Sequence, residues 1–103
     1  MIRIVDGRDT GKTKKLLEEC SRTGGIYVCA HPERVLEKCR AYGLDYWKIL
    51  PMGYKDFILK KYTQYGDNIY IDELELLTKE LIRIIDGNNT LAGYTVTMED
   101  KED

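Results

Sequence analysis

A short glycine-containing segment near the amino terminus carries the residue types that bind phosphate. It reads Asp6-Gly7-Arg8-Asp9-Thr10-Gly11-Lys12-Thr13. In a segment of this type, glycine lets the backbone curl so that amide N–H groups surround the phosphates, a lysine contacts the outer phosphates, and a hydroxyl coordinates magnesium. Gly11, Lys12 and Thr13 supply these groups in the required order. The segment therefore predicts that the chain binds a nucleotide together with Mg²⁺.

A second chemical signal is an acidic pair at the end of an apolar run, in the sequence Asn68-Ile69-Tyr70-Ile71-Asp72-Glu73. In nucleotide hydrolases, an aspartate delivered by such a strand joins the magnesium shell, and a neighbouring glutamate orients or activates the attacking water. We therefore expect Thr13 and Asp72 to be the metal ligands and Glu73 to be the catalytic residue.

Alternating apolar and amphipathic stretches must position these residues. Apolar runs bounded by turn residues indicate strands, and apolar residues at helical spacing indicate helices. Strands that alternate with helices over short links form a mostly parallel sheet covered on both faces. The fold class is therefore expected to be α/β, with three αβα layers and four to five short strands in a single domain over residues 1–98, followed by an acidic tail over 99–103. The sequence predicts strands over residues 2–5, 26–30, 47–50, 68–73 and 90–98, and helices over 11–22, 32–43, 54–62 and 74–85.

The cysteines give no sign of a disulfide framework or a zinc site. Cys20, Cys29 and Cys39 are odd in number, widely spaced, and without a CxxC pair, so we expect reduced thiols in the core. In the second predicted helix we expect Val35, Leu36 and Cys39 to be buried. His31 has no suitable partner close in sequence and is interpreted as a turn residue.

Composition limits the class of function. The chain has 103 residues, of which 43% are hydrophobic and 33% charged, and no apolar stretch approaches the length of a membrane span. Its amino terminus lacks the pattern of a secretory signal, so we expect a cytoplasmic protein with no membrane contact. The net charge of −2 gives no general attraction to nucleic acid. Lysines interleaved with tyrosines, as in 54–55 and 60–65, fit either a stacking or interaction surface or a roof over the small core.

The segment Gly7-Arg8-Asp9-Thr10-Gly11-Lys12-Thr13 resembles the arginine-containing phosphate loop of phage terminase large subunits and of related helicase-like ATPases, which are P-loop NTPases. Residues 26–32 are similar to the strand and loop that follow in that family, Asp72-Glu73 resembles its acidic pair, and 95–97 resembles its coupling strand. The resemblance implies a P-loop fold that binds ATP and Mg²⁺, with Arg8 near the phosphates and Gly7, Arg8, Asp9, Thr10, Gly11, Lys12 and Thr13 lining the nucleotide. The adenine-holding segment, a trans-acting arginine and the nuclease domain of the family are missing, which implies a reduced phage or prophage relative.

Two carboxylates depart from the usual phosphate loop. Asp6 stands where the first glycine is expected, and Asp9 where another glycine is common. At an effective dielectric constant of about 20, like charges about 5 Å apart repel by roughly 3 kcal/mol. A simpler interpretation therefore stays open, in which Asp9 and Thr10 only cap the following helix. Asp72 with Glu75 would likewise fit a capping box that opens the last helix.

The function that these signals favour is magnesium-dependent binding of a nucleotide, ATP or GTP. Hydrolysis is expected to be slow or absent, because a single small domain has little means of closing over the nucleotide, and a homo-oligomer or a partner would have to supply a further cation. The alternative is a non-enzymatic module that binds a phage or host protein and retains a degenerate P-loop fold. Asp6 and Asp9 favour this alternative.

Overall fold

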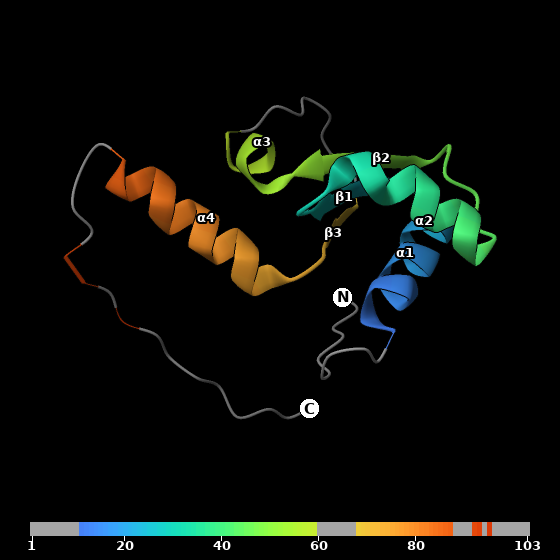
Figure 1. The fold of residues 1–103 in the computed structure, drawn as a ribbon, viewed down its shortest axis with the longest axis horizontal. Helices are drawn as coiled ribbons and strands as arrows, with labels where there is room; N and C mark the ends of the chain where they lie inside the picture. The colour runs from blue at the N-terminus through green and yellow to red at the C-terminus, as the bar shows by residue number, and fades with distance from the viewer. Residues whose placement is uncertain (1–10, 60–67, 88–91, 94, 96–103) are drawn as a thin grey trace.

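The fold is taken from a computed structural model that describes residues 11–59, 68–87, 92–93 and 95. Within these residues helices alternate with short strands along the chain (Figure 1). The predicted strand over 2–5, most of the predicted strand over 90–98 and the tail over 99–103 lie outside them. The elements are α1 (Lys12–Thr23), β1 (Gly25–Cys29), the 3₁₀ turn η1 (Pro32–Arg34), α2 (Val35–Tyr42), β2 (Ile49–Gly53), α3 (Tyr54–Ile58), β3 (Ile69–Ile71) and α4 (Leu74–Asp86).

The described strands form a three-stranded parallel sheet in the order β2-β1-β3. Strand β1 lies in the centre, with Tyr27 opposite Pro51 of β2 and Tyr70 of β3. Parallel neighbours need a crossover between them, and the helices supply it. The prediction of a mostly parallel α/β domain is thus confirmed for these residues. The expected total of four to five strands included one over 2–5, which lies outside them, and one over 90–98, of which only residues 92, 93 and 95 are described and lie in no strand.

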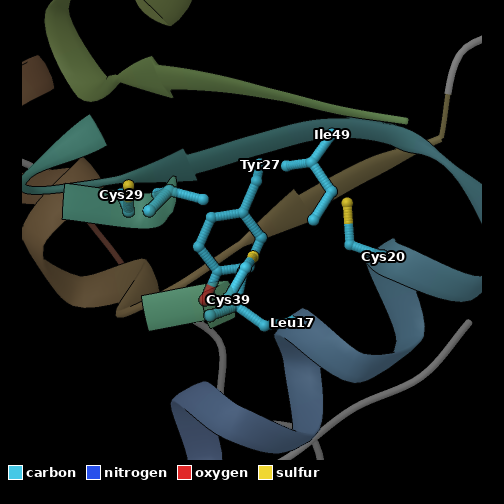
Figure 2. Packing of buried hydrophobic residues seen from close by; sticks show 7 residues of the cluster. Leu17, Cys20, Tyr27, Cys29, Cys39 and Ile49 are labelled. Carbon is cyan, nitrogen blue, oxygen red and sulfur yellow. The ribbon is translucent and has the colours of Figure 1, made fainter. Parts of the chain in front are cut away.

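Helices cover both faces of the sheet, which is compatible with αβα layering. Successive side chains of β1 point to opposite faces. Tyr27 and Cys29 pack against α1 and α2 on one face, where Figure 2 shows the Tyr27 ring among buried side chains of the cluster. Ile26 and Val28 pack on the other face with Met52 and with α3 and α4. The core therefore consists of two small clusters that share one central strand.

Some sequence expectations need correction. Leu36 is 39% exposed, whereas Val35 and Cys39 are buried. Val35 and Cys39 are four residues apart and share the face of α2 that packs against the sheet, whereas Leu36 lies beside this face. The third strand begins at Ile49 rather than at Trp47 and continues through Pro51 to Gly53. Proline is accepted there because β2 is an edge strand of the described sheet. Of the helix predicted over 54–62, the structure has α3, which ends at Ile58; residues 60–62 lie outside the described residues.

The last helix, α4, packs mainly on α3 and has no fully buried residue. Leu77 packs against the cluster around Val28. Leu74, Leu81 and Ile85 remain 60%, 44% and 40% exposed. This helix has 13 residues, and no helix in the described ranges is long and apolar enough to cross a membrane.

Replacing Gly25 with alanine is expected to destabilise the fold strongly. Gly25 has φ of +146°, and a Cβ there would lie 2.4 Å from the backbone oxygen of Asn68. We expect Gly25→Ala to lower the free energy of unfolding by roughly 2–4 kcal/mol, as measured by urea denaturation. Gly43→Ala is the matched control, because Gly43 has φ of +71° with open space around its Cβ position. The control should lose only about 1 kcal/mol, and equal losses in the two variants would contradict this account.

The cysteines are expected to be unreactive until the chain unfolds. Burial raises the pKa of Cys20 to about 12 and that of Cys29 to about 11, and it also raises the pKa of Cys39. Because the thiolate is the reacting form, Ellman's reagent at pH 8 should titrate none of them rapidly in the native protein. All three should react in guanidinium chloride. Rapid labelling of one thiol before unfolding would show that the cluster opens locally.

Candidate functional site

The amino terminus of α1 presents two of the predicted phosphate-site residues. The helix is preceded by Gly11 in a left-handed conformation, with φ of 80° and ψ of 21°, which glycine adopts without strain. Lys12 and Thr13 lie in the first turn, where backbone N–H groups and the helix dipole favour an anion. Leu17 and Cys20 are buried against the sheet and fix this helix in place. The first turn of α1 is thus held at one edge of the packed core.

Asp72 follows the carboxyl end of β3, and its backbone is held by hydrogen bonds from two directions. Its N–H donates to the carbonyl oxygen of Val28 on β1 at 2.9 Å. The hydroxyl of Tyr54, at the start of α3, donates to the Asp72 carbonyl at 2.5 Å. With the backbone fixed, the carboxylate accepts a hydrogen bond from Thr13 Oγ1, at 3.1 Å to Oδ2 and 3.4 Å to Oδ1. Residues 59 positions apart in the sequence therefore meet.

Glu73 and Lys12 form a second contact beside the first. Lys12 Nζ lies 3.8 Å from Glu73 Oε1, with side chains 24% and 35% exposed. Glu73 has φ of 61°, and it is the single non-glycine residue with positive φ in the described part of the chain. Such a conformation costs roughly 1–2 kcal/mol and is often found at functional sites. The neighbouring Glu75 carboxyl raises the pKa of Glu73, and the Lys12 ammonium opposes that rise.

The donor set is suited to Mg²⁺ rather than to a metal held by protein alone. Within the described residues no group of three or more His, Cys, Asp or Glu side chains is placed to hold a metal ion. Thr13 and Asp72 supply one hydroxyl and one carboxylate. Magnesium is commonly held by one or two carboxylates, with water and substrate phosphates completing its octahedral shell. The residues present therefore fit Mg²⁺ when a phosphate ligand accompanies it.

The structure brings together Lys12, Thr13, Asp72 and Glu73, next to Gly11. The remaining predicted nucleotide-binding residues, Gly7, Arg8, Asp9 and Thr10, lie outside the described residues.

The sequence also allowed two helix-capping interpretations, one at the start of α4 and one at the start of α1. Helix α4 is preceded by Glu73, and no side chain caps it, so the capping box of Asp72 with Glu75 is not formed. The capping box is absent because the Asp72 carboxylate accepts a hydrogen bond from Thr13 instead. The other capping interpretation involves Asp9 and Thr10, which lie outside the described residues; the residue that directly precedes α1 is Gly11. His31 is an exposed turn residue whose Nδ1 lies 3.5 Å from a Glu33 oxygen.

Sequence reasoning did not identify the tyrosines around Asp72. Tyr54 directly follows the end of β2 and holds the Asp72 carbonyl. Tyr27 is buried on β1. The available signal was positional, because residues at the carboxyl ends of parallel strands meet at one edge of the sheet.

Loss of the Thr13 hydroxyl is expected to weaken the fold. Thr13→Val keeps the shape and the β-branch but removes the donor to Asp72, and should cost about 1 kcal/mol of unfolding free energy. Thr78→Val is the matched control, since the Thr78 hydroxyl only donates to the Leu74 carbonyl within its own helix, at 3.2 Å on an exposed face. Thermal and urea unfolding of both variants measure the difference. A control that loses as much as Thr13→Val would argue against a bond between α1 and β3.

Comparison of the chain with protein-family models, with curated proteins and with solved structures gave no match. The candidate site is therefore defined by its own geometry, which is the meeting of Thr13 with Asp72 and of Lys12 with Glu73.

Proposed function

We propose that this chain binds a magnesium–nucleoside triphosphate, ATP or GTP, at the carboxyl edge of its parallel sheet in the manner of a minimal P-loop domain. The observation that carries the proposal is the contact of Thr13 with Asp72 at 3.1 Å, across 59 residues. The hydroxyl of Thr13, in the first turn of a helix, meets an aspartate that follows a parallel strand, and the neighbouring Lys12 meets Glu73, the residue after that aspartate. The resemblance to terminase-type ATPases supports a phage or prophage origin.

The roles follow from the positions of the side chains. Under this proposal Lys12 contacts the outer phosphates, and the resemblance to the phosphate loop assigns further nucleotide contacts to Gly7, Arg8, Asp9 and Thr10, which lie outside the described residues. The first turn of α1 adds to the attraction for an anion, because N–H groups at the start of a helix have no partner within the helix itself. In the structure Lys12 is paired with Glu73 at a partly exposed position, where an ion pair contributes little stability. Lys12 can therefore exchange the carboxylate for phosphate at small cost.

Thr13 and Asp72 hold the cation. A hydroxyl has one proton and two lone pairs, so Thr13 can donate to Asp72 while offering a lone pair to the metal. Bound Mg²⁺ would neutralise phosphate charge and orient the terminal phosphate. The existing hydrogen bond keeps the two ligands at a suitable separation before the cation arrives.

Glu73 is the residue proposed to orient the attacking water. Its contact with Lys12 engages the same carboxylate that hydrolysis needs. Turnover is therefore slow or absent unless phosphate binding draws Lys12 away, and a second copy or a partner supplies a further cation. Glu73→Gln removes one charged competitor for Lys12 together with the proposed catalytic charge.

Calorimetric titration of nucleotide tests the proposal. MgATP and MgGTP are added to the wild type and to Lys12→Ala, with Lys15→Ala as the matched control, because Lys15 is an exposed lysine on the same helix. We expect saturable binding by the wild type and by the control, and none by Lys12→Ala at the same concentrations. Glu73→Gln should bind at least as tightly as the wild type while releasing no inorganic phosphate. Absence of heat from the wild type at millimolar nucleotide would refute the proposed function.

A second candidate is a non-enzymatic interaction module, and exposed aromatic residues favour it. Trp47 is 74% and Tyr46 44% exposed just before the edge strand β2. Trp47 also lines a groove of about 390 Å³ together with Glu18, Arg22 and Lys48. Exposed tryptophan and arginine are frequent anchors of protein interfaces. This function would gain support if nucleotide titration were silent, and an empty pull-down from host lysate would then count against it.

A further inference from the structure

The hydroxyl of Tyr27 is a buried polar group that lacks a partner. Tyr27 is 1% exposed, and its hydroxyl oxygen has no hydrogen bond within the part of the chain that the structure describes. Buried polar side-chain atoms are nearly always paired, and an exception calls for an explanation such as a missing ion or water. Phenylalanine would fill the same apolar cluster without this unsatisfied group.

The surroundings of Tyr27 connect it with the candidate site. Its ring lies in the cluster with Leu17, one turn after Thr13 on α1 (Figure 2). The next residue, Val28, accepts the backbone hydrogen bond of Asp72. Burial raises the pKa of Tyr27, and the Asp72 carboxylate raises it further, both through its negative charge and as a hydrogen-bond acceptor near the hydroxyl; Cys29 and Cys20 contribute to a smaller extent. The hydroxyl is thus within electrostatic reach of Asp72.

We propose that Tyr27 is a positioning residue of the cation site, whose hydroxyl donates a hydrogen bond to the Asp72 carboxylate when a hydrated divalent cation binds at Thr13 and Asp72. This inference rests on the proposed function. It goes beyond the ligand set by assigning a task to a residue on the central strand that touches neither phosphate nor metal.

The need for a second donor follows from the protons available around Asp72. The Thr13 hydroxyl offers one proton, which is shared unequally between the two carboxylate oxygens at 3.1 and 3.4 Å. A cation, or a water in its shell, would engage one of these oxygens and pull the carboxylate toward itself. Carboxylates that ligate metals are in turn fixed by hydrogen bonds from outside the ligand shell. Tyr27 is a buried donor already placed on the β1 side of Asp72, and cation binding gives its hydroxyl the partner that it lacks.

The test compares Tyr27→Phe with Tyr70→Phe. Tyr70 lies on the neighbouring strand β3, and its hydroxyl is 2.5 Å from Thr23 Oγ1, at the opposite end of α1 from Thr13. For the wild type and both variants, ATP affinity is measured by calorimetry in Mg²⁺ and in EDTA. We expect Tyr27→Phe to weaken the affinity in Mg²⁺ by about tenfold and to leave the affinity in EDTA unchanged. Tyr70→Phe should change neither.

A second readout needs no ligand. Because the Tyr27 hydroxyl makes no hydrogen bond in the cation-free fold, Tyr27→Phe should melt at or above the wild-type temperature in EDTA. A clear drop in melting temperature would show that the hydroxyl already has a partner and would overturn the inference. Equal Mg²⁺ dependence in wild type and Tyr27→Phe would overturn it as well, while leaving the proposed function intact. If the wild type bound no nucleotide under either condition, both the function and this role of Tyr27 would be refuted.

Discussion

The parallel pairing of β3 with β1 is the constraint on which the site depends. Ile26 and Val28 of β1 lie opposite Ile69 and Ile71, so that the residue after β3 donates its N–H to the carbonyl of Val28. This bond fixes where Asp72 leaves the sheet, next to the first turn of α1. A change of one residue in register would turn the side chains of β3 to the other face and would separate Asp72 from Thr13. The register of β3 in the sheet therefore has to be correct before Asp72 and Thr13 can act together.

The sequence was sufficient for elements whose signals are local. Periodic apolar residues predicted α1, β1 and α4 nearly to their observed bounds, and the thiols were correctly placed in the core. It was insufficient where the outcome depended on a distant partner. Asp72 matches both a helix cap and a metal ligand, and only the position of Thr13 decides which bond it makes. Leu36 and Trp47 are apolar residues whose exposure follows from the direction of α2 and the start of β2, which periodicity alone does not determine.

The two faces of the sheet carry different parts of the site. The face under α1 and α2 is tightly buried, with Leu17, Cys20 and Cys39 fully enclosed, and it supports the turn that contains Thr13. The opposite face is covered by α3 and α4, and α4 leaves several apolar side chains exposed. Asp72 is held from both faces, through Thr13 on one and the Tyr54 hydroxyl on the other. The short helix α3 is therefore a structural support for the acidic pair and more than a connection between strands.

Under the proposed function the site has one pair of side chains that stays in contact and one pair that exchanges partners. The hydrogen bond between Thr13 and Asp72 is compatible with cation binding, since the hydroxyl keeps its lone pairs while it donates. Under the proposed function the pair of Lys12 with Glu73 would open, since Lys12 would turn toward the phosphates. Glu73 is also the residue with the left-handed backbone, and its carboxyl has a raised pKa because Glu75 is adjacent. Backbone strain and the like charge of Glu75 thus both fall on Glu73, which belongs to the pair that exchanges. A polyanion that drew Lys12 away would leave the Glu73 carboxylate in its least stabilised surroundings. Under the proposed function, this is the arrangement expected of a carboxylate that acts only after the nucleotide has bound.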